Sequence, residues 1–403
     1  MRICIYTDTA LPKLGGQEIV IDALARQFIA AGHDVKVLAP RPKLNTDTDR
    51  ELPYAVVRHP RFVSTRWLVP WYRRYLRQLY RQWPFDILHC HNVYRAGYVA
   101  ALCCDTLSVP LVITSHGSDV YARNCRLRKR GLPWRHRQAL HRADALIAIS
   151  DFTAQGMRQL APDITTPIVP IPNGVDPAPF ARPVPLNFPQ LQPENYLLFL
   201  GRLHVCKGVD LLLRAAEQII DVLGNVALVI AGEGTERASL EALAHELGLA
   251  ERTHFLGRVV GEQKVSLLQH CLAVVMPSRQ REAFGLVALE AYAAGRPVIA
   301  TRLPGLGEVV RHEETGLLVE PDNVEQLAGA LRRVITDDEA RRRWSEQALT
   351  ISRDYSWPQI AASHLDLYQQ LIDRPTAPAA VRPPTWLGLR AAASAEPIRY
   401  SAG

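Results

Sequence analysis

Two glutamates, Glu282 and Glu290, stand eight positions apart in this 403-residue sequence, on either side of the tripeptide Phe284-Gly285-Leu286. On one continuous helix they would lie roughly 12 Å and 80° apart, which is a poor geometry for an acid/base pair. The glycine predicts a bend, with Glu282 in a loop over a helix N-terminus and Glu290 on a later turn. This spacing suits two contacts to one elongated ligand, whose anionic part meets the amides near Gly285.

Two cations occupy a second stretch, GRLHVCKG at 201–208, where Arg202 and Lys207 lie between glycines after an apolar run. A pair of cations at a strand end suits a diphosphate. In GGQE, Gly15 and Gly16 allow close approach of the backbone at a helix start, where free N–H groups bind anions. Taken alone, GRLHVCKG also fits solvated surface charges, and GGQE also fits a tight turn.

His116 of HGSD follows a further apolar run, where its ring can hydrogen-bond a ligand hydroxyl, although a lone loop histidine is more often structural. Two other motifs are interpreted as loops. Asp47-Thr48-Asp49 spells DxD, a metal–diphosphate signature of some sugar transferases, but no apolar strand flanks it. AGEGTER at 231–237 begins like a dinucleotide fingerprint and lacks the third glycine.

Short apolar runs alternate with helical patterns and predict the elements that position these residues. Strands are expected at 2–6, 34–39, 85–90, 110–114 and 145–150, and again at 196–200, 226–231, 272–277, 297–301 and 316–319. A helix is expected at 16–31. The alternation predicts an α/β fold of two doubly wound, Rossmann-like domains. Because ligands bind at the carboxyl ends of parallel strands, the candidate residues should line a cleft between the domains.

The domain boundary is marked by proline. We expect an N-terminal domain at 1–176, a Pro-rich linker at 177–193 and a C-terminal domain at 194–356. The Pro-, Ala- and Ser-rich tail at 374–403 is expected to be disordered.

Composition favours a cytoplasmic globular protein. The seven cysteines are scattered without a CxxC pair, which suits a reduced compartment better than disulfides or a zinc site. Asp8 interrupts the first apolar run, so this run predicts a strand and not a signal peptide. No apolar stretch approaches the roughly 20 residues of a membrane span.

Charge is concentrated in the first half. Residues 1–185 hold 25 Lys and Arg against 14 Asp and Glu, a net +11, whereas residues 186–403 hold 22 against 26, a net −4. Arginines alternate with aromatic residues, including Trp67, in the segment 64–86, and the segment 121–144 adds seven Arg and Lys129 with one acid. Basic aromatic helices suit an anionic membrane surface or a lipid-linked acceptor, and they equally fit ordinary amphipathic helices with solvated arginines.

The motifs in this order resemble the retaining nucleotide-sugar glycosyltransferases of family 4, the group 1 glycosyl transferases, which have the GT-B fold. The resemblance covers residues 1 to about 372 and is carried by GGQEIVIDALARQFIAAGHDV (15–35), HGSD (116–119), IAIS (147–150), IPNGVD (171–176), GRLHVCKG (201–208), AGEG (231–234), FLGR (255–258), the Glu282–Glu290 element and TGLLVEPDN (315–323). The segment 355–371 resembles the family's closing helices, so a final helix at about 357–372 should pack back onto the first domain. PGLGE at 304–308 departs from the glycine pair that often precedes the family's loop glutamate, here Glu308.

The resemblance implies a role for each candidate. Arg202 and Lys207 should hold the donor diphosphate, Glu290 the ribose hydroxyls, and Glu282 with the amides of Phe284, Gly285 and Leu286 the transferred sugar and phosphates. His116 should lie beside the sugar ring, the Gly15–Gly16 turn at the distal phosphate, and Val259 near the nucleobase. The family's chemistry implies same-face attack without a divalent ion or other cofactor.

The expected partners are a UDP- or GDP-sugar donor and a sugar, polysaccharide-precursor or lipid-linked acceptor, with peripheral contact to an anionic inner membrane face and no nucleic acid. Three other classes remain open at this stage: a GT-B nucleotide-sugar epimerase, a non-catalytic polyanion-binding protein and a dinucleotide oxidoreductase. The absence of an RRM, KH or HTH signature argues against nucleic acid, and the incomplete fingerprint argues against the oxidoreductase.

Overall fold

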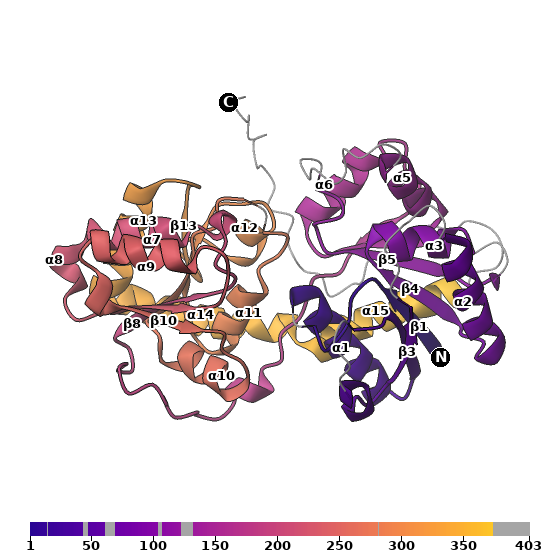
Figure 1. The fold of residues 1–403 in the computed structure, drawn as a ribbon, viewed down its shortest axis with the longest axis horizontal. Coiled ribbons are helices and arrows are strands. Elements are labelled where there is room, and N and C mark those ends of the chain that lie inside the picture. The colour runs from indigo at the N-terminus through magenta and orange to yellow at the C-terminus, as the bar shows by residue number, and fades with distance from the viewer. Residues whose placement is uncertain are drawn as a thin grey trace.

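The computed structural model describes residues 1–13, 15–42, 47–60, 69–103, 107–121, 132–280 and 282–373. Within these residues the chain forms two α/β domains that lie side by side (Figure 1). The tail at 374–403, Trp67 and residues 122–131 of the basic run, including Lys129, lie outside the described residues, so the predictions made for them stay predictions.

The first domain contains a parallel sheet, in which the described residues form seven strands in the order β3-β2-β1-β4-β5-β6-β7. The strands are β1 (Arg2–Thr7), β2 (Asp34–Pro40), β3 (Ala55–His59), β4 (Ile87–His91), β5 (Leu111–Ser115), β6 (Ala145–Ala148) and β7 (Ile168–Pro170). The helices are α1 (Gly16–Ala30), α2 (Val69–Gln82), a π-helix (Val93–Gly97), α3 (Tyr98–Ala101), α5 (Leu132–Arg142) and α6 (Asp151–Leu160), with a 3-10 turn at Asp47–Glu51.

The second domain repeats this architecture, with six described parallel strands in the order β10-β9-β8-β11-β12-β13. The strands are β8 (Tyr196–Leu200), β9 (Ala227–Ala231), β10 (Thr253–Gly257), β11 (Ala273–Met276), β12 (Val298–Thr301) and β13 (Gly316–Val319). The helices are α7 (Val209–Glu217), α8 (Ile220–Leu223), α9 (Arg237–Glu246), α10 (Gly261–His270), α11 (Leu286–Ala293), α12 (Leu306–Val309), α13 (Val324–Thr336) and α14 (Asp338–Ser352), and the last helix of the chain, α15 (Trp357–Ile372), follows them. Short 3-10 turns occur at Ala178–Phe180, Val205–Lys207, Ala250–Arg252 and Arg353–Tyr355.

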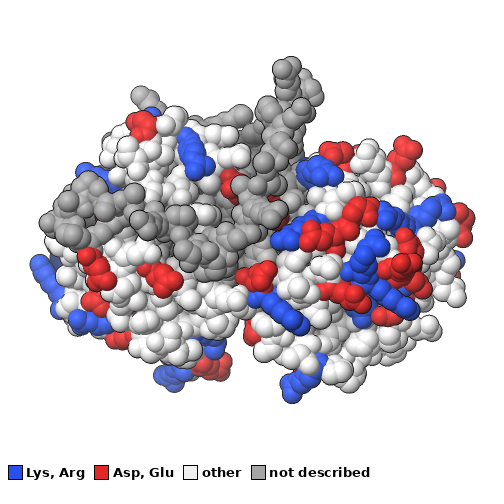
Figure 2. All heavy atoms as spheres, turned by 180° about the vertical axis from the view of Figure 1, so that it is seen from behind, with Lys and Arg blue, Asp and Glu red and all other residues white. Residues whose placement is uncertain are grey.

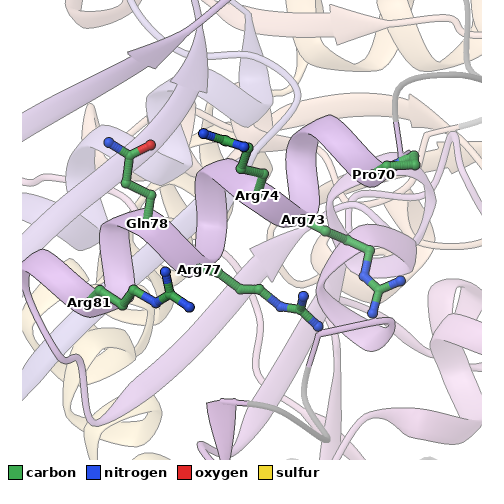
Figure 3. Close-up of a pocket in the computed structure, with 6 residues that line it drawn as sticks. All are labelled: Pro70, Arg73, Arg74, Arg77, Gln78 and Arg81. Atoms are coloured by element: carbon green, nitrogen blue, oxygen red, sulfur yellow. The ribbon is translucent and has the colours of Figure 1, made fainter.

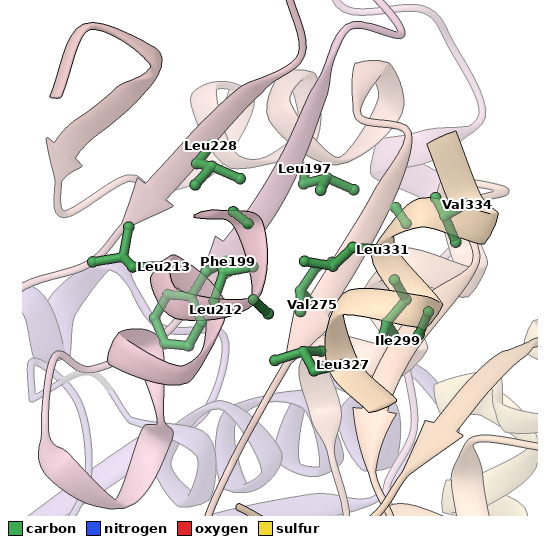
Figure 4. Close-up of a cluster of buried hydrophobic side chains, with 14 of the residues drawn as sticks. Leu197, Phe199, Leu212, Leu213, Leu228, Val275, Ile299, Leu327, Leu331 and Val334 are labelled. Atoms are coloured by element: carbon green, nitrogen blue, oxygen red, sulfur yellow. The ribbon is translucent and has the colours of Figure 1, made fainter. Parts of the chain in front are cut away.

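Apolar faces of helices and strands meet in the core of each domain. In the second domain, leucines of α7 and α13 pack on the inward side chains of β8, β9, β11 and β12 (Figure 4). Leu197, Leu212 and Leu331 are fully buried there, and burying each such side chain contributes roughly 1.5–3 kcal/mol of transfer free energy. The strand ends, and the loops that follow them, are therefore held on a rigid scaffold.

The ten strands predicted from apolar runs are confirmed to within two residues at their ends. The prediction missed β3, β7 and β10, and all three lie at an edge of their sheet. An edge strand has a neighbour on one side only, and these three are only partly buried, so their sequences lack a continuous apolar run.

The Pro-rich segment at 177–193 lies against α10 of the second domain. The Gln269 side chain accepts a hydrogen bond from the Val184 N–H at 2.9 Å and donates to the Arg182 carbonyl at 2.9 Å. The Ser266 hydroxyl donates to the Pro185 carbonyl at 2.8 Å. The prolines leave carbonyl oxygens free for such contacts, so this segment is attached to the domain that follows it.

The chain returns to the first domain through α15, which extends from the second domain across to α1 (Figure 1). Ile360, Leu367 and Tyr368 of α15 are buried in the same core as Phe28 of α1. Where the two connections between the domains cross, the Val175 N–H donates to the Tyr355 carbonyl at 2.7 Å. The last helix therefore shares the core of the first domain, although it follows the second domain in sequence.

Buried histidines lie where α15 meets the first sheet. His89, His91 and His364 are almost fully inaccessible, and Tyr368 Oη hydrogen-bonds His89 Nδ1 at 2.6 Å. Burial lowers the pKa of all three imidazoles, that of His364 to about 4. The folded protein therefore keeps them neutral under conditions in which the unfolded chain protonates them.

The free energy of unfolding should consequently decrease as the pH is lowered below about 6.5, because the unfolded state then binds protons that the native state excludes. Each such histidine contributes a slope of about 1.4 kcal/mol per pH unit between its unfolded and folded pKa values. Urea unfolding at pH 7, 6 and 5 measures the slope. His364→Leu should reduce it, whereas Gln370→Leu, at an exposed position of the same helix that carries no titratable group, should leave it unchanged. An undiminished slope in His364→Leu would contradict the assignment.

Candidate active site

The carboxyl ends of the two sheets face each other. Ser150, which follows β6, donates its hydroxyl hydrogen to the Ala283 carbonyl of the second domain at 2.7 Å. A methyl group on Gly16, at the start of α1, would lie 3.4 Å from Leu286 Cδ1, at the start of α11. Two helix N-termini from different domains are thus brought together, and both were among the predicted site residues.

The loop after β8 places its two cations by burying the residue between them. Leu203 is fully buried, Arg202 beside it is exposed, and Lys207 lies at the end of a 3-10 turn. The Lys207 ammonium forms an ion pair with Glu282, and both side chains are largely shielded from solvent. The structure therefore joins one cation of GRLHVCKG directly to the first glutamate of the Glu282–Glu290 element.

Arg279 holds this turn in place and was not predicted as a site residue. Its guanidinium binds both carboxylate oxygens of Asp210 at 2.5 and 2.6 Å and donates to the Val205 carbonyl at 3.2 Å. Its backbone N–H donates to the Cys206 carbonyl at 2.9 Å. No local spacing relates Arg279 to a residue 69 positions earlier, so sequence reasoning had no signal for this pair.

The bend predicted at Gly285 is confirmed. Gly285 has φ +109° and is the N-cap of α11, which begins at Leu286. Phe284 is buried beside it, with its ring centroid 6.2 Å from that of Tyr355. The backbone turns sharply between Glu282 and the helix, which directs the first N–H groups of α11 toward the first domain.

Glu290 lies on a later turn of α11 and has a partner that the sequence did not indicate. Lys264 of α10 donates to Glu290 Oε1 at 2.6 Å, and both side chains are mostly buried. Val259, which follows β10, is buried close to the start of the same helix α10. Glu282 and Glu290 each have their own lysine, so they do not share a proton as an acid/base dyad.

On the first domain, the GGQE turn begins α1 with Gly15 as its extended N-cap. Glu18 is buried within this first helical turn, beside Thr9 and 2.8 Å from the Lys13 ammonium. Burial raises the pKa of Glu18, but hydrogen bonds from Lys13 and Thr9 outweigh it and keep the pKa below its ordinary value. The carboxylate therefore stabilises the start of α1.

His116 forms a hydrogen bond with a second histidine, since its Nε2 lies 2.8 Å from His91 Nδ1. Burial lowers the pKa of His116 to about 4, against the opposing influence of Asp119 and Glu18. The imidazole is therefore neutral at physiological pH and acts as a hydrogen-bonding group. His91 was missed, because a histidine inside a buried strand has no local pattern that marks it as functional.

Two further polar residues lie at this edge of the first sheet. Asn92 follows β4 with φ +94°, which is uncommon for a residue other than glycine, and donates to Gln17 Oε1 at 3.1 Å. Burial raises the pKa of Asp8, directly after β1, to about 7 despite the charge of Arg95. The position of Asp8 at a strand end was the signal that could have marked it as a site residue.

The two motifs interpreted as loops also have structural roles. Arg58 Nε donates to Asp49 at 2.8 Å. Asp49 is the aspartate of the DxD sequence whose side chain the structure describes, and it is therefore paired within the first domain. AGEG follows β9, where the Leu203 N–H donates to the Glu233 carbonyl at 2.9 Å. This strand-end loop therefore supports the loop that carries Arg202.

Two facing parallel α/β domains, with cations and helix N-termini at their opposed strand ends and a last helix that returns to the first domain, define the GT-B class of glycosyltransferases. The Anabaena protein Alr3699/HepE, solved in complex with UDP, is similar with a TM-score of 0.79 at 21% identity, covering 92% of this chain and 100% of that one. This likeness shows the fold.

Sequence comparisons identify the family. The profile described as glycosyl transferases group 1 matches residues 187–350, and that of glycosyltransferase family 4 matches residues 14–179. An uncharacterized glycosyltransferase of Methanocaldococcus jannaschii, MJ1607, is 28% identical over 391 residues, covering 92% of this chain and 98% of the relative. A second from that organism, MJ1178, is 31% identical over 288 residues, covering 72% and 76%. The chain belongs to glycosyltransferase family 4 and is a glycosyltransferase.

The bend at Gly285 allows a direct test. Alanine there would be held at φ +109° with its methyl group 2.7 Å from Leu306 Cδ1, so Gly285→Ala should cost about 1–3 kcal/mol of stability. Gly329→Ala, inside α13 with open space around it, should be neutral or slightly stabilising. Urea unfolding measures both variants, and a Gly285→Ala protein as stable as Gly329→Ala would contradict the required bend.

Proposed function

We propose that this glycosyltransferase moves a hexosyl unit from a nucleotide-diphosphate sugar to a sugar, polysaccharide-precursor or lipid-linked acceptor, with retention of the anomeric configuration. The observation that carries the proposal is the meeting of the α1 and α11 N-termini beside Lys207. Helix N-termini and a cation form an anion site without further ligands. The similarity to a protein solved in complex with UDP supports a nucleotide diphosphate as that anion.

Each side chain has a role in this proposal. Arg202 and Lys207 bind the diphosphate, together with the amides of Phe284, Gly285 and Leu286, and Gly16 with Gly15 faces its distal phosphate. Glu290, oriented by Lys264, accepts hydrogen bonds from the ribose hydroxyls. Glu282 and the neutral His116 hydrogen-bond the sugar, and Val259 lies by the base.

Charge development explains why these groups accelerate transfer. As the bond between the sugar C1 and the phosphate oxygen breaks, its electron pair remains on the departing diphosphate. Preorganised cations and amides stabilise this charge more in the transition state than in the ground state. The acceptor hydroxyl then attacks C1 from the same face and gives its proton to a phosphate oxygen. This route uses no protein nucleophile and, in our proposal, no divalent ion.

Replacing either cation should remove most of the transfer. Loss of one such electrostatic contact typically lowers kcat by about 10²–10³-fold, so Arg202→Ala and Lys207→Ala should each fall in that range, and Arg214→Ala on α7 should retain normal activity. Thermal shifts with UDP-, GDP- and ADP-sugars first select the donor, because a bound donor raises apparent stability. Transfer is then assayed in EDTA.

Near-normal turnover in either variant would contradict the role of these cations, and strict dependence on added metal would contradict the metal-free route. The assay also distinguishes the enzyme classes, because isomerised sugar nucleotide formed without acceptor would identify an epimerase. Inversion at C1 in the product would contradict retention.

We also propose that the first domain contacts an anionic membrane from the cytoplasmic side through α2. The described residues include no helix that is long and apolar enough to cross a bilayer. Figure 3 shows Arg73, Arg77 and Arg81 projecting from one side of α2. Together with Pro70, Arg74 and Gln78 they line a hollow of about 540 Å³. The helix carries no acid, and Trp71 on it is 44% exposed. On the face in Figure 2, in contrast, basic and acidic side chains are intermixed over the second domain.

Vesicle sedimentation tests this contact. Near an anionic surface each arginine contributes about 1 kcal/mol, so the triple variant R73Q/R77Q/R81Q should bind phosphatidylserine vesicles about 100-fold more weakly than wild type. A control with the same loss of charge on the second domain, R214Q/R342Q/R343Q, should bind normally. Binding that is equal in the two triple variants, or absent in wild type at low salt, would contradict the proposal.

A further inference from the structure

A single carboxylate joins the two domains at the start of α6. Glu308 of the second domain accepts a hydrogen bond from the Asp151 N–H at 2.7 Å and another from the Phe152 N–H at 3.2 Å. The same carboxylate accepts from the Gly305 N–H of its own domain at 3.1 Å. Glu308 therefore satisfies free N–H groups at two helix N-termini that belong to different domains.

A second contact lies beside it. Ser150 is the N-cap of α6, where its hydroxyl oxygen accepts from the Thr153 N–H at 3.2 Å. The hydroxyl hydrogen is thereby available to the other domain and is donated to the Ala283 carbonyl at 2.7 Å. A methyl group on Gly117 would lie only 2.3 Å from Ala283 Cβ, so the two backbones approach as closely as a glycine permits.

Both contacts converge on the loop that carries Glu282. Glu282 forms an isolated parallel bridge with Gly305, whose N–H is bound by Glu308. Ala283, held by Ser150, is the next residue in the chain. The position of Glu282 therefore depends on groups of the first domain, and these contacts exist only while the domains are closed together.

We infer that Glu308 and Ser150 are positioning residues that hold the two domains closed and thereby place Glu282 against the sugar. This inference rests on the proposed function, because it assumes that Glu282 faces the transferred sugar. The proposed diphosphate and ribose contacts of Arg202, Lys207 and Glu290 belong to the second domain, and the first domain adds the Gly15–Gly16 turn at the distal phosphate. Opening of the domains should therefore impair the chemical step more than it impairs binding of the nucleotide.

The test compares Glu308→Gln with Glu314→Gln, an exposed glutamate of the same domain that pairs with Arg311. The glutamine keeps one acceptor oxygen and directs an NH₂ group at backbone N–H donors. One hydrogen bond to a charged group changes an equilibrium constant by roughly 10- to 100-fold. The equilibrium between closed and open domains should shift by that factor in Glu308→Gln, and kcat should fall accordingly. The dissociation constant of the matching nucleoside diphosphate, measured by calorimetry, should stay within about 3-fold of wild type. A 3-fold change corresponds to less free energy than one such hydrogen bond contributes.

Small-angle scattering of the protein without added nucleotide supplies a readout independent of activity. Glu308→Gln should increase the radius of gyration, and Glu314→Gln should not. Ser150→Ala removes the Ala283 contact without changing charge, so it should change kcat and scattering in the same direction and serves if Glu308→Gln does not fold.

The outcomes separate the two proposals. Wild-type kcat and scattering in Glu308→Gln and Ser150→Ala would overturn the positioning role and leave the proposed function standing. Failure of the wild-type protein to transfer sugar from any nucleotide sugar, together with expansion of Glu308→Gln, would defeat the proposed function and leave the domain contact standing. An equal loss of nucleoside diphosphate binding and of kcat would also overturn the inference, because it would place Glu308 in ligand binding.

Discussion

In a parallel sheet, every strand ends and every following helix begins at the same edge. Both sheets of this enzyme are parallel, and their carboxyl ends are opposed, so the polar loops and the free N–H groups of the helices meet between the domains. The α1 and α11 N-termini, Lys207 and Glu282 all owe their proximity to this arrangement. The remaining structure keeps the two edges rigid and opposed.

The two domains are held together by unlike kinds of contact. α15 shares the apolar core of the first domain, and the chain crossings at 173–177 and 353–357 are joined backbone to backbone, so this side of the molecule is fixed. At the opposed strand edges, Ser150 and Glu308 form hydrogen bonds across the boundary. Exchanging polar contacts of this kind for contacts with water costs less free energy than exposing the apolar core. Relative motion of the domains should therefore pivot about the crossings.

Burial of polar groups is concentrated on the first domain. His89 and His91 lie inside β4, and His116 at the end of β5 is neutral because it is desolvated. A neutral imidazole hydrogen-bonds a hydroxyl without adding charge beside a sugar, and the two candidate site cations, Arg202 and Lys207, belong to the second domain. The first domain therefore contributes a neutral hydrogen-bonding group to the site because it buries its polar side chains, and the second domain contributes cations.

The sequence by itself determined ten of the thirteen described strands, the bend at Gly285 and the family, because buried parallel strands require apolar runs and a left-handed backbone requires glycine. It also separated Glu282 from Glu290, since no helix could bring carboxylates at that spacing onto one proton. Only the tertiary structure paired Glu290 with Lys264, Lys207 with Glu282, and Glu308 with a helix 156 to 157 residues away. Local patterns encode which residues reach a sheet edge, but the partner at that edge depends on how separately folded elements pack, and no spacing in the chain records it.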